Sequence, residues 1–367
     1  SGLMRIVEAR VEVLEIPFRE PVISGAHRWE EHRAGLLILA TDDDRRALGE
    51  FPAPRPDDLG EDVSPRLAAL LDGLEMGDPV SVEGTLRRID ALPFVGRAAR
   101  SATETAMVDL LAQVNRRPIA RFLDSQAVED VAVNALLGID PPDATATLAA
   151  AHVAAGYRCL KLKAGQEPDG AIETRVAAVR EAVGPDVALR LDFNGSLSTE
   201  VAQDLLAAVS RYDIEYAEQP IPPSAGAEAL ARLRWTGAVP IAADESVRDL
   251  GAARVLLETG AVDALVVKPA RVGGLRQAAA IVELATSNSV PVTVSTLFET
   301  GVGLAAALHL ATIAPGPQAH GLATGALLSS DLLRAPLAVL DGRMRRPTAP
   351  GLGVDLDEDA VQRYRVA

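Results

Sequence analysis

The sequence predicts an α/β fold, in which a parallel (β/α)8 barrel follows a smaller α+β domain. From about residue 130, short β-rich runs alternate with helical patterns, which is typical of strand–helix–strand units and a parallel sheet. The first part of the chain instead shows strand-like runs followed by helices. At 367 residues, the chain is long enough for both parts.

The N-terminal part contains three alternating runs, at residues 6–16, 35–40 and 47–51, which predict antiparallel strands. Helical patterns follow at 64–74 and 98–115. Residues 19–33 and the proline-rich stretch 51–62 are predicted to be loops. Two interpretations fit these loops equally well, a lid over the mouth of the barrel and a plain surface connection.

The barrel is predicted from eight strand-like runs, of which the last is the weakest: 131–134, 158–163, 187–192, 214–218, 239–244, 264–268, 291–295 and 319–322. Helical patterns at 144–155, 171–183, 199–211 and 275–287 lie between them. We therefore expect an α+β domain at 4–125 and a barrel at 126–335 that carries the catalytic residues. The tail at 336–367 is long enough to pack back on the first domain.

Three acidic residues fall at the ends of three successive predicted strands, about 25 residues apart, which is the length of one strand-plus-helix unit. They are Asp192, Glu218 and Asp244. Adjacent strand ends would bring these carboxylates close together, where they repel one another unless a cation lies among them. An all-oxygen ligand set suits Mg²⁺ or Mn²⁺. Asn194 and Glu245 are candidate accessory groups beside this set.

Lysines end the runs on either side. Lys161 and Lys163 are two positions apart on one strand, so both face the lumen, and Lys268 ends the sixth run across the mouth. A substrate carboxylate at the metal would place its α-carbon between the ammonium groups. That arrangement suits abstraction of a proton α to a carboxylate, through an enediolate intermediate. Repulsion between the paired lysines, with the metal nearby, is expected to lower the pKa of the base.

The alternative interpretation is structural: lysines and carboxylates would neutralise one another with no metal. It leaves the regular placement at successive strand ends unexplained, and lysines that point inward at a barrel mouth favour the catalytic interpretation. A non-catalytic barrel that binds a metabolite is a more remote alternative.

These motifs resemble the enolase superfamily and, within it, the muconate-lactonizing enzyme subgroup. The K-L-K motif, the segments D-F-N-G, Y-A-E-Q-P and A-A-D-E-S, and V-V-K-P-A-R-V-G-G carry the resemblance, and residues 102–111 are similar to the helix that closes the family's capping domain. The resemblance implies a modified (β/α)8 barrel with an N-terminal capping domain, and Mg²⁺ held by the three carboxylates.

Within the subgroup, the sequence is most similar to the o-succinylbenzoate synthases of menaquinone biosynthesis, which are lyases. The segments that carry this similarity include Asn134, Ser295, Gly321 and Ala323, and these residues are expected to contact or surround the substrate. The similarity implies that Lys163 is the base.

The same similarity makes Lys161 a charge partner near the substrate carboxylate, and Lys268 the group that steadies the intermediate. Dipeptide epimerases carry D-x-D where this chain has residues 321–324, so a cationic dipeptide substrate is disfavoured. The K-P-x-R-V-G-G form also resembles N-succinylamino acid racemases. An N-acylamino acid racemase, or a related racemase or cycloisomerase, is therefore the alternative.

Composition narrows the range of partners. A formal net charge of −15 argues against nucleic acid. No apolar stretch reaches the roughly 20 residues of a membrane span. The lone Cys159 fits a reducing, cytoplasmic compartment, and the residues before Met4 look like a cloning remnant. We expect a small-molecule carboxylate substrate, and a homo-oligomer is compatible with this composition.

Overall fold

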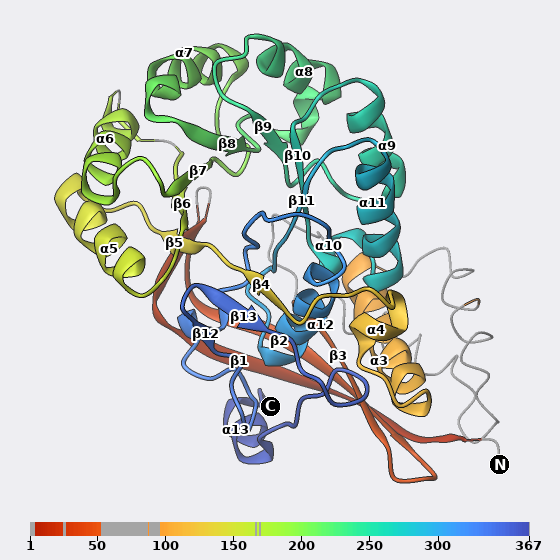
Figure 1. Ribbon diagram of the computed structural model, residues 1–367. Helices are drawn as coiled ribbons and strands as arrows, with labels where there is room; N and C mark the ends of the chain where they lie inside the picture. Colours follow the sequence, from red (N-terminus) through yellow and green to blue (C-terminus); the bar gives the residue numbers. More distant parts are fainter. Residues whose placement is uncertain are drawn as a thin grey trace.

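The computed structural model describes residues 4–24, 27–52, 87, 96–165, 167, 168 and 170–366 (Figure 1). The predicted helix at 64–74 and most of the proline-rich stretch lie outside the described residues. The strands are β1 (Ile6–Ser24), β2 (His27–Thr41), β3 (Arg46–Pro52), β4 (Asp130–Ala132), β5 (Ala135–Leu137), β6 (Cys159–Lys163), β7 (Ala188–Asp192), β8 (Ile214–Glu218), β9 (Ile241–Ala243), β10 (Ala264–Val267), β11 (Val292–Val294), β12 (Val339–Leu340) and β13 (Arg343–Arg345).

The helices follow the predicted alternation. The α-helices are α3 (Arg97–Val114), α4 (Ile119–Leu123), α5 (Pro142–Ala154), α6 (Ala171–Val183), α7 (Thr199–Val209), α8 (Ala227–Trp235), α9 (Leu250–Glu258), α10 (Pro269–Val272), α11 (Leu275–Ser287), α12 (Gly301–Ala311) and α13 (Glu358–Tyr364). Short 3-10 turns lie at η1 (Ser210–Tyr212), η2 (Pro223–Ala225) and η3 (Gly325–Leu327).

The N-terminal sheet has the order β1-β2-β3 and is antiparallel, as predicted. The prediction of a loop at 19–33 is wrong, because β1 extends to Ser24 and β2 begins at His27, and the two strands stay paired here, with Val22 opposite Trp29. The register shifts between Pro17 and Val22. That irregularity, and the charged residues of both arms, hide the strand periodicity in the sequence, although Val22 and Trp29 pack on the core.

The barrel is built on a parallel sheet with the order β11-β10-β9-β8-β7-β6-β5, and helices α5 to α9 lie on its outside (Figure 1). The weak eighth strand is present only as two isolated parallel bridges, Val133 to His320 and Ser295 to Gly321. These bridges join the segment 319–322 to both ends of the sheet. The predicted fold class, a (β/α)8-type barrel with an N-terminal α+β domain, is confirmed.

The first predicted barrel strand is partly wrong. Residues 130–132 form β4, which pairs antiparallel with β13 of the C-terminal tail, and the first strand of the parallel sheet is β5. The apolar run at 131–134 therefore serves two sheets. Beyond β13, the tail returns to the N-terminal sheet, where Val366 N–H donates to the Val13 carbonyl at 2.9 Å.

Strand alternation positions the site. On β6, Leu160 and Leu162 pack in the core, whereas Lys161 and Lys163 take the opposite face. The lumen below the site is closed by a separate apolar cluster of Tyr216, Ala242, Ala264 and Val266. Two positions further along, the same face carries Glu218, Asp244 and Lys268 at the C-terminal ends, where barrel enzymes place their catalytic residues.

Among the described residues, no helix has the length and apolar character needed to cross a bilayer.

Candidate active site

Lysine and carboxylate side chains meet at the C-terminal ends of the barrel strands. Lys163 on β6 is opposite Asp192 on β7 in the sheet register, and Asp192 is opposite Glu218 on β8. Asp244 and Lys268 directly follow β9 and β10. The three carboxylate residues are at most 1% exposed. Charges buried to this extent need partners of opposite sign, and the site supplies them.

The two lysines of β6 contact the carboxylates directly. Lys161 Nζ is 3.0 Å from Asp192 Oδ2 and 3.0 Å from Glu218 Oε1, so it lies between two strand ends. Lys163 Nζ donates to Asp192 Oδ2 and to Asn194 Oδ1, both at 2.8 Å. Both amines are therefore held by groups that the sequence had marked as candidates.

Lys268 approaches the cluster from the other side. Its Nζ donates to Asp244 Oδ2 at 2.7 Å. Arg271, which α10 turns back toward the barrel, donates to the other oxygen of the same carboxylate. Asp244 therefore has two cationic partners. The arginine of the K-P-A-R segment was not among the predicted site residues, although it lies only three positions after Lys268.

Each carboxylate responds differently to this environment. Burial, together with the charge of Asp192, raises the pKa of Glu218 to about 7. Burial also opposes ionisation of Asp192, but Lys161 and Lys163 outweigh it and lower the pKa of Asp192. Burial alone would lower the pKa of Lys161, yet Asp192 and Glu218 hold that pKa well above its usual value.

Two accessory residues lie beside the cluster. Asn194, at a positive φ of 46°, accepts a hydrogen bond from Lys163 and donates through Nδ2 to Glu245 Oε1 at 3.1 Å. In the described part of the chain, the other carboxylate oxygen of Glu245 is buried with no hydrogen-bond partner. Burial, then the charge of Asp244, raises the pKa of Glu245. A further cation near Glu245 would be compatible with both observations.

The donor set fits a hard divalent cation in kind: several buried carboxylates from neighbouring strands, without histidine or cysteine. As the side chains stand, the described residues contain no group of three or more His, Cys, Asp or Glu side chains arranged to hold a metal ion. The ammonium groups lie among the carboxylates instead. A metal would therefore require the lysine–carboxylate pairs to rearrange.

The opposite wall is formed where the barrel closes. Ser295 Oγ donates to the Gly321 carbonyl at 3.1 Å, and a Cβ added to Gly321 would lie 2.6 Å from Ser295 Oγ and 3.7 Å from Asn134 Oδ1. Three predicted substrate-side residues are therefore neighbours. Ala323 is half-buried two positions further on and packs against the core.

Sequence reasoning missed two further buried residues. Gln219 accepts hydrogen bonds from the backbone N–H groups of Asp244 and Ser246, at 3.1 and 3.0 Å, and so ties the end of β8 to the loop after β9. Arg190 crosses the lumen to the Ala319 carbonyl at 2.8 Å and lies over the Tyr216 ring, 4.6 Å from its centroid. The Gln following Glu218 was visible in Y-A-E-Q-P, but its long-range partners were not.

One signal in the composition was also missed. The chain contains three lysines, Lys161, Lys163 and Lys268, and every other basic residue apart from histidine is arginine. All three lysines are buried in this one cluster. Arginine stays charged under all ordinary conditions, whereas the lysine amine can lose its proton when its surroundings demand it. All the lysine amines of the chain are thus gathered at this one cluster.

Comparison with known proteins identifies the class. Residues 144–360 match the family described as "Enolase C-terminal domain-like". The chain belongs to this family, and it is an enzyme of the enolase superfamily. The resemblance carried by its motifs is confirmed.

Relatives within the family catalyse different reactions. The o-succinylbenzoate synthase of Thermobifida fusca is 36% identical over 239 residues, covering 65% of this chain and 72% of the relative. The N-succinylamino acid racemase of Thermus thermophilus is 32% identical and covers 98% of this chain and 97% of the relative.

One solved structure of a related enzyme was crystallised with Mg. The dipeptide epimerase from Enterococcus faecalis, crystallised with Mg and the dipeptide L-Leu-L-Tyr, has a TM-score of 0.88 and 26% identity, covering 96% of this chain and 99% of that structure. Related enzymes with this fold therefore include lyases and epimerases, and at least one has been crystallised with Mg.

Proposed function

We propose that this enzyme is an o-succinylbenzoate synthase, a lyase that eliminates water from a cyclohexadiene carboxylate after removing the proton α to the carboxylate. One observation carries the proposal: the chain's three lysines and three carboxylates lie together, buried, at the mouth of the barrel. The similarity to an o-succinylbenzoate synthase at 36% identity supports the choice of reaction.

In this proposal Lys163 is the base. Its amine lies between Asp192 and the neutral amide oxygen of Asn194, a position that fixes its direction. Lys161 would balance charge near the substrate carboxylate. Lys268, on the other side of the cluster, would steady the negative charge that develops when the proton leaves.

Asp192, Glu218 and Asp244 would hold Mg²⁺, with Mn²⁺ as a substitute. When bound, the ion would supply positive charge at the substrate carboxylate, which stabilises the enediolate character of the substrate after proton removal. Asn194 and Glu245 would support the carboxylates and Lys163. Asn134, Ser295, Gly321 and Ala323 would form the wall against the rest of the substrate.

A second candidate is racemisation of an N-succinylamino acid. A racemase needs a base on each face of the α-carbon, and Lys163 and Lys268 approach the cluster from β6 and from the end of β10. The racemase from Thermus thermophilus matches nearly the whole chain. A dipeptide with a free ammonium group is disfavoured, because residues 321–324 contain no acidic side chain.

The test is to monitor the menaquinone-pathway diene acid by ultraviolet absorbance, with purified protein and Mg²⁺. We expect consumption of the diene acid, abolished by exhaustive chelation and restored by Mg²⁺. An unchanged rate after chelation, or no consumption at all, would remove this assignment. Deuterium appearing in recovered N-succinylamino acid in D₂O, without turnover of the diene acid, would favour the racemase.

A further inference from the structure

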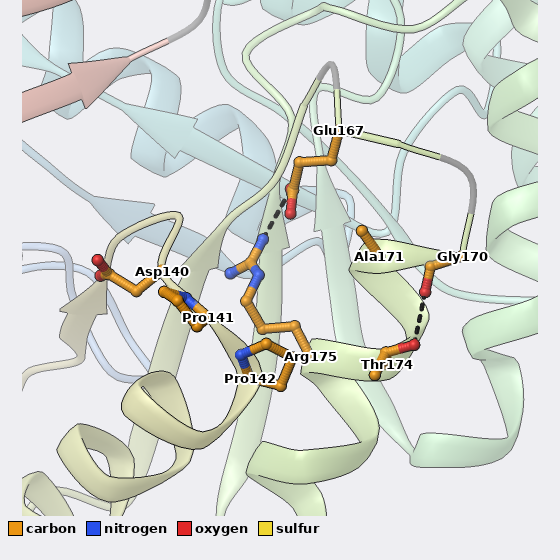
Figure 2. A pocket seen from close by; sticks show the side chains of 8 residues that line it. All are labelled: Asp140, Pro141, Pro142, Glu167, Gly170, Ala171, Thr174 and Arg175. Atoms are coloured by element: carbon orange, nitrogen blue, oxygen red, sulfur yellow. Dashed lines mark hydrogen bonds and ion pairs between the residues drawn. The ribbon is translucent and has the colours of Figure 1, made fainter.

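Arg175, on helix α6, is a buried charged residue outside the carboxylate cluster. It is 2% exposed and lines a surface pocket at the loops that follow β5 and β6. Figure 2 shows its side chain reaching toward Glu167, with Asp140 and Pro141 on one side and Ala171 on the other. The side-chain oxygen of Glu167 accepts a hydrogen bond from Arg175 Nη2 at 2.8 Å.

The same guanidinium group binds the backbone at the ends of two barrel strands. Arg175 Nη2 donates to the carbonyl of Lys163 at 2.6 Å, and Nη1 donates to the carbonyl of Gly138 at 3.2 Å. Gly138 directly follows β5, and Lys163 is the last residue of β6. One side chain therefore joins two strand ends and, through Glu167, the loop that leaves β6.

The sheet register explains why this contact is needed. The last paired residues of β5 and β6 are Leu137 and Leu162, so β5 provides no partner for Lys163. A buried backbone carbonyl without a partner costs about 1–3 kcal/mol. Arg175 takes the place of the missing strand neighbour at the residue whose side chain is proposed to remove the substrate proton.

We propose that Arg175 is a positioning residue: by binding the Lys163 carbonyl, it fixes the backbone from which the Lys163 amine reaches Asp192 and Asn194. This inference rests on the proposed role of Lys163 as the base. Arg175 itself touches no reacting atom. Its effect on catalysis is transmitted through the backbone of β6 and through the loop that Glu167 anchors.

The chain offers a matched control on the same helix. Arg180 also donates to backbone carbonyls, those of Gly184 and Val187 at 2.7 Å, but these lie at the N-terminal end of β7, away from the site. Arg175→Met and Arg180→Met each remove a guanidinium that binds backbone carbonyls. In the first variant alone, the lost contact is at Lys163.

Two readouts are needed. Because the chain has three lysines, protein labelled with [ε-¹³C]lysine gives three lysine signals, which Lys→Arg variants assign. We expect Arg175→Met, in the presence of Mg²⁺, to shift the Lys163 signal and to lower kcat by about 10- to 100-fold, with little change in KM, as misplacement of a catalytic group predicts. Arg180→Met should leave the Lys163 signal and kcat unchanged.

Arg175→Gln, whose amide can still donate to one carbonyl, should fall between wild type and Arg175→Met, and it provides the test if the Met variant does not fold. A folded Arg175 variant whose Lys163 signal and kcat match those of Arg180→Met would overturn the proposal. If the wild-type protein is inactive on both proposed substrates, the proposed function is wrong. The NMR signal of Lys163 would then decide by itself whether Arg175 positions this lysine.

Discussion

At the scale of single residues, the site depends on which groups can change their charge. The three lysines lie in one buried cluster, where their partners are carboxylates. The pKa values of these carboxylates shift in opposite directions: Lys161 and Lys163 lower the pKa of Asp192, whereas burial raises that of Glu218. We therefore expect the loss of Asp192 and the loss of Glu218 to affect the protein differently. The same holds for Lys163 and Lys268.

The lysines distinguish the two proposed reactions. In a synthase, Lys163→Ala should abolish turnover, because it removes the only proposed base. Lys268→Ala should be severe, and Lys268→Arg should keep part of the activity since a charge is retained. In a two-base racemase, each single variant would still exchange the α-proton of one enantiomer. Exchange measured by NMR in D₂O that survives in both variants, each for a different enantiomer, would rule out the one-base reaction.

The carboxylates differ in what they contribute to stability. Asp192→Asn should lower Tm in metal-free protein, because it leaves two buried ammonium groups without their shared anion. Glu218→Gln should change the metal-free Tm less, since burial and the charge of Asp192 raise the pKa of Glu218 to about 7, so the fold stabilises its charged form less than water does. Mg²⁺ should raise the wild-type Tm and raise that of Glu218→Gln less. Equal Tm losses in both metal-free variants would contradict this account of the cluster.

At the scale of elements, two buried carboxylates from the N-terminal part of the chain bind the N-termini of two barrel helices. Glu104 on α3 accepts from the Arg276 N–H at the start of α11, at 2.7 Å. Glu50 on β3 accepts from the N–H groups of Thr300 and Gly303 at the start of α12, both at 2.8 Å. Helix N-termini favour negative charge, so these contacts hold the N-terminal sheet and α3 against the barrel.

Glu50→Ala tests that contact. It removes the acceptor of two backbone N–H groups, of which that of Thr300 is buried, and of one buried hydroxyl, so it should lower the free energy of unfolding by at least about 2 kcal/mol. Glu358→Ala is a matched control, because Glu358 forms an exposed pair with Arg46 worth under about 1 kcal/mol. The measurement is chemical denaturation of both variants. Similar losses would show that the helix cap contributes little.

Asp109 on α3 links the same region to the C-terminal tail. It accepts from the N–H groups of Leu48 and Leu352, each at 2.9 Å. Burial raises its pKa to about 6. Because the pKa of Asp109 is higher in the folded protein than in the unfolded chain, protonation of Asp109 stabilises the fold. This stabilisation is fully present below the unfolded pKa of 3.8 and is lost as the pH rises through 6.

Asp109→Asn should remove that pH dependence. The stability of the variant relative to wild type should rise between pH 4 and 6, at up to about 1.4 kcal/mol per pH unit, and level off above pH 6. Denaturation of both proteins across this range measures the difference. A difference that stays constant with pH would mean that Asp109 does not titrate in the folded protein as its burial implies.

At the scale of the whole molecule, the sequence predicted what strand periodicity determines. The strand ends carrying Asp192, Glu218 and Lys163 follow from alternation and regular spacing, so they were visible without a structure. The hairpin at 19–33 was missed because its arms are polar and its register is irregular.

The remaining features depend on contacts between distant parts of the chain. The first barrel strand was misplaced because residues 130–132 pair with a tail strand more than 200 positions away. Arg175 and Gln219 were missed for a related reason: most of their partners are backbone groups, and every residue has a backbone. No residue pattern marks which carbonyl or N–H a side chain will reach.

The central claim is that this enzyme removes the proton α to a carboxylate by means of Lys163. The most direct measurement is ¹H NMR in D₂O with Mg²⁺, in which wild type and Lys163→Ala are each given the diene acid and, separately, an N-succinylamino acid. The account predicts that wild type converts the diene acid to the aromatic product and that Lys163→Ala loses this conversion. Wild type that neither consumes the diene acid nor exchanges the α-proton of the amino acid, or Lys163→Ala that retains the full rate, would contradict it.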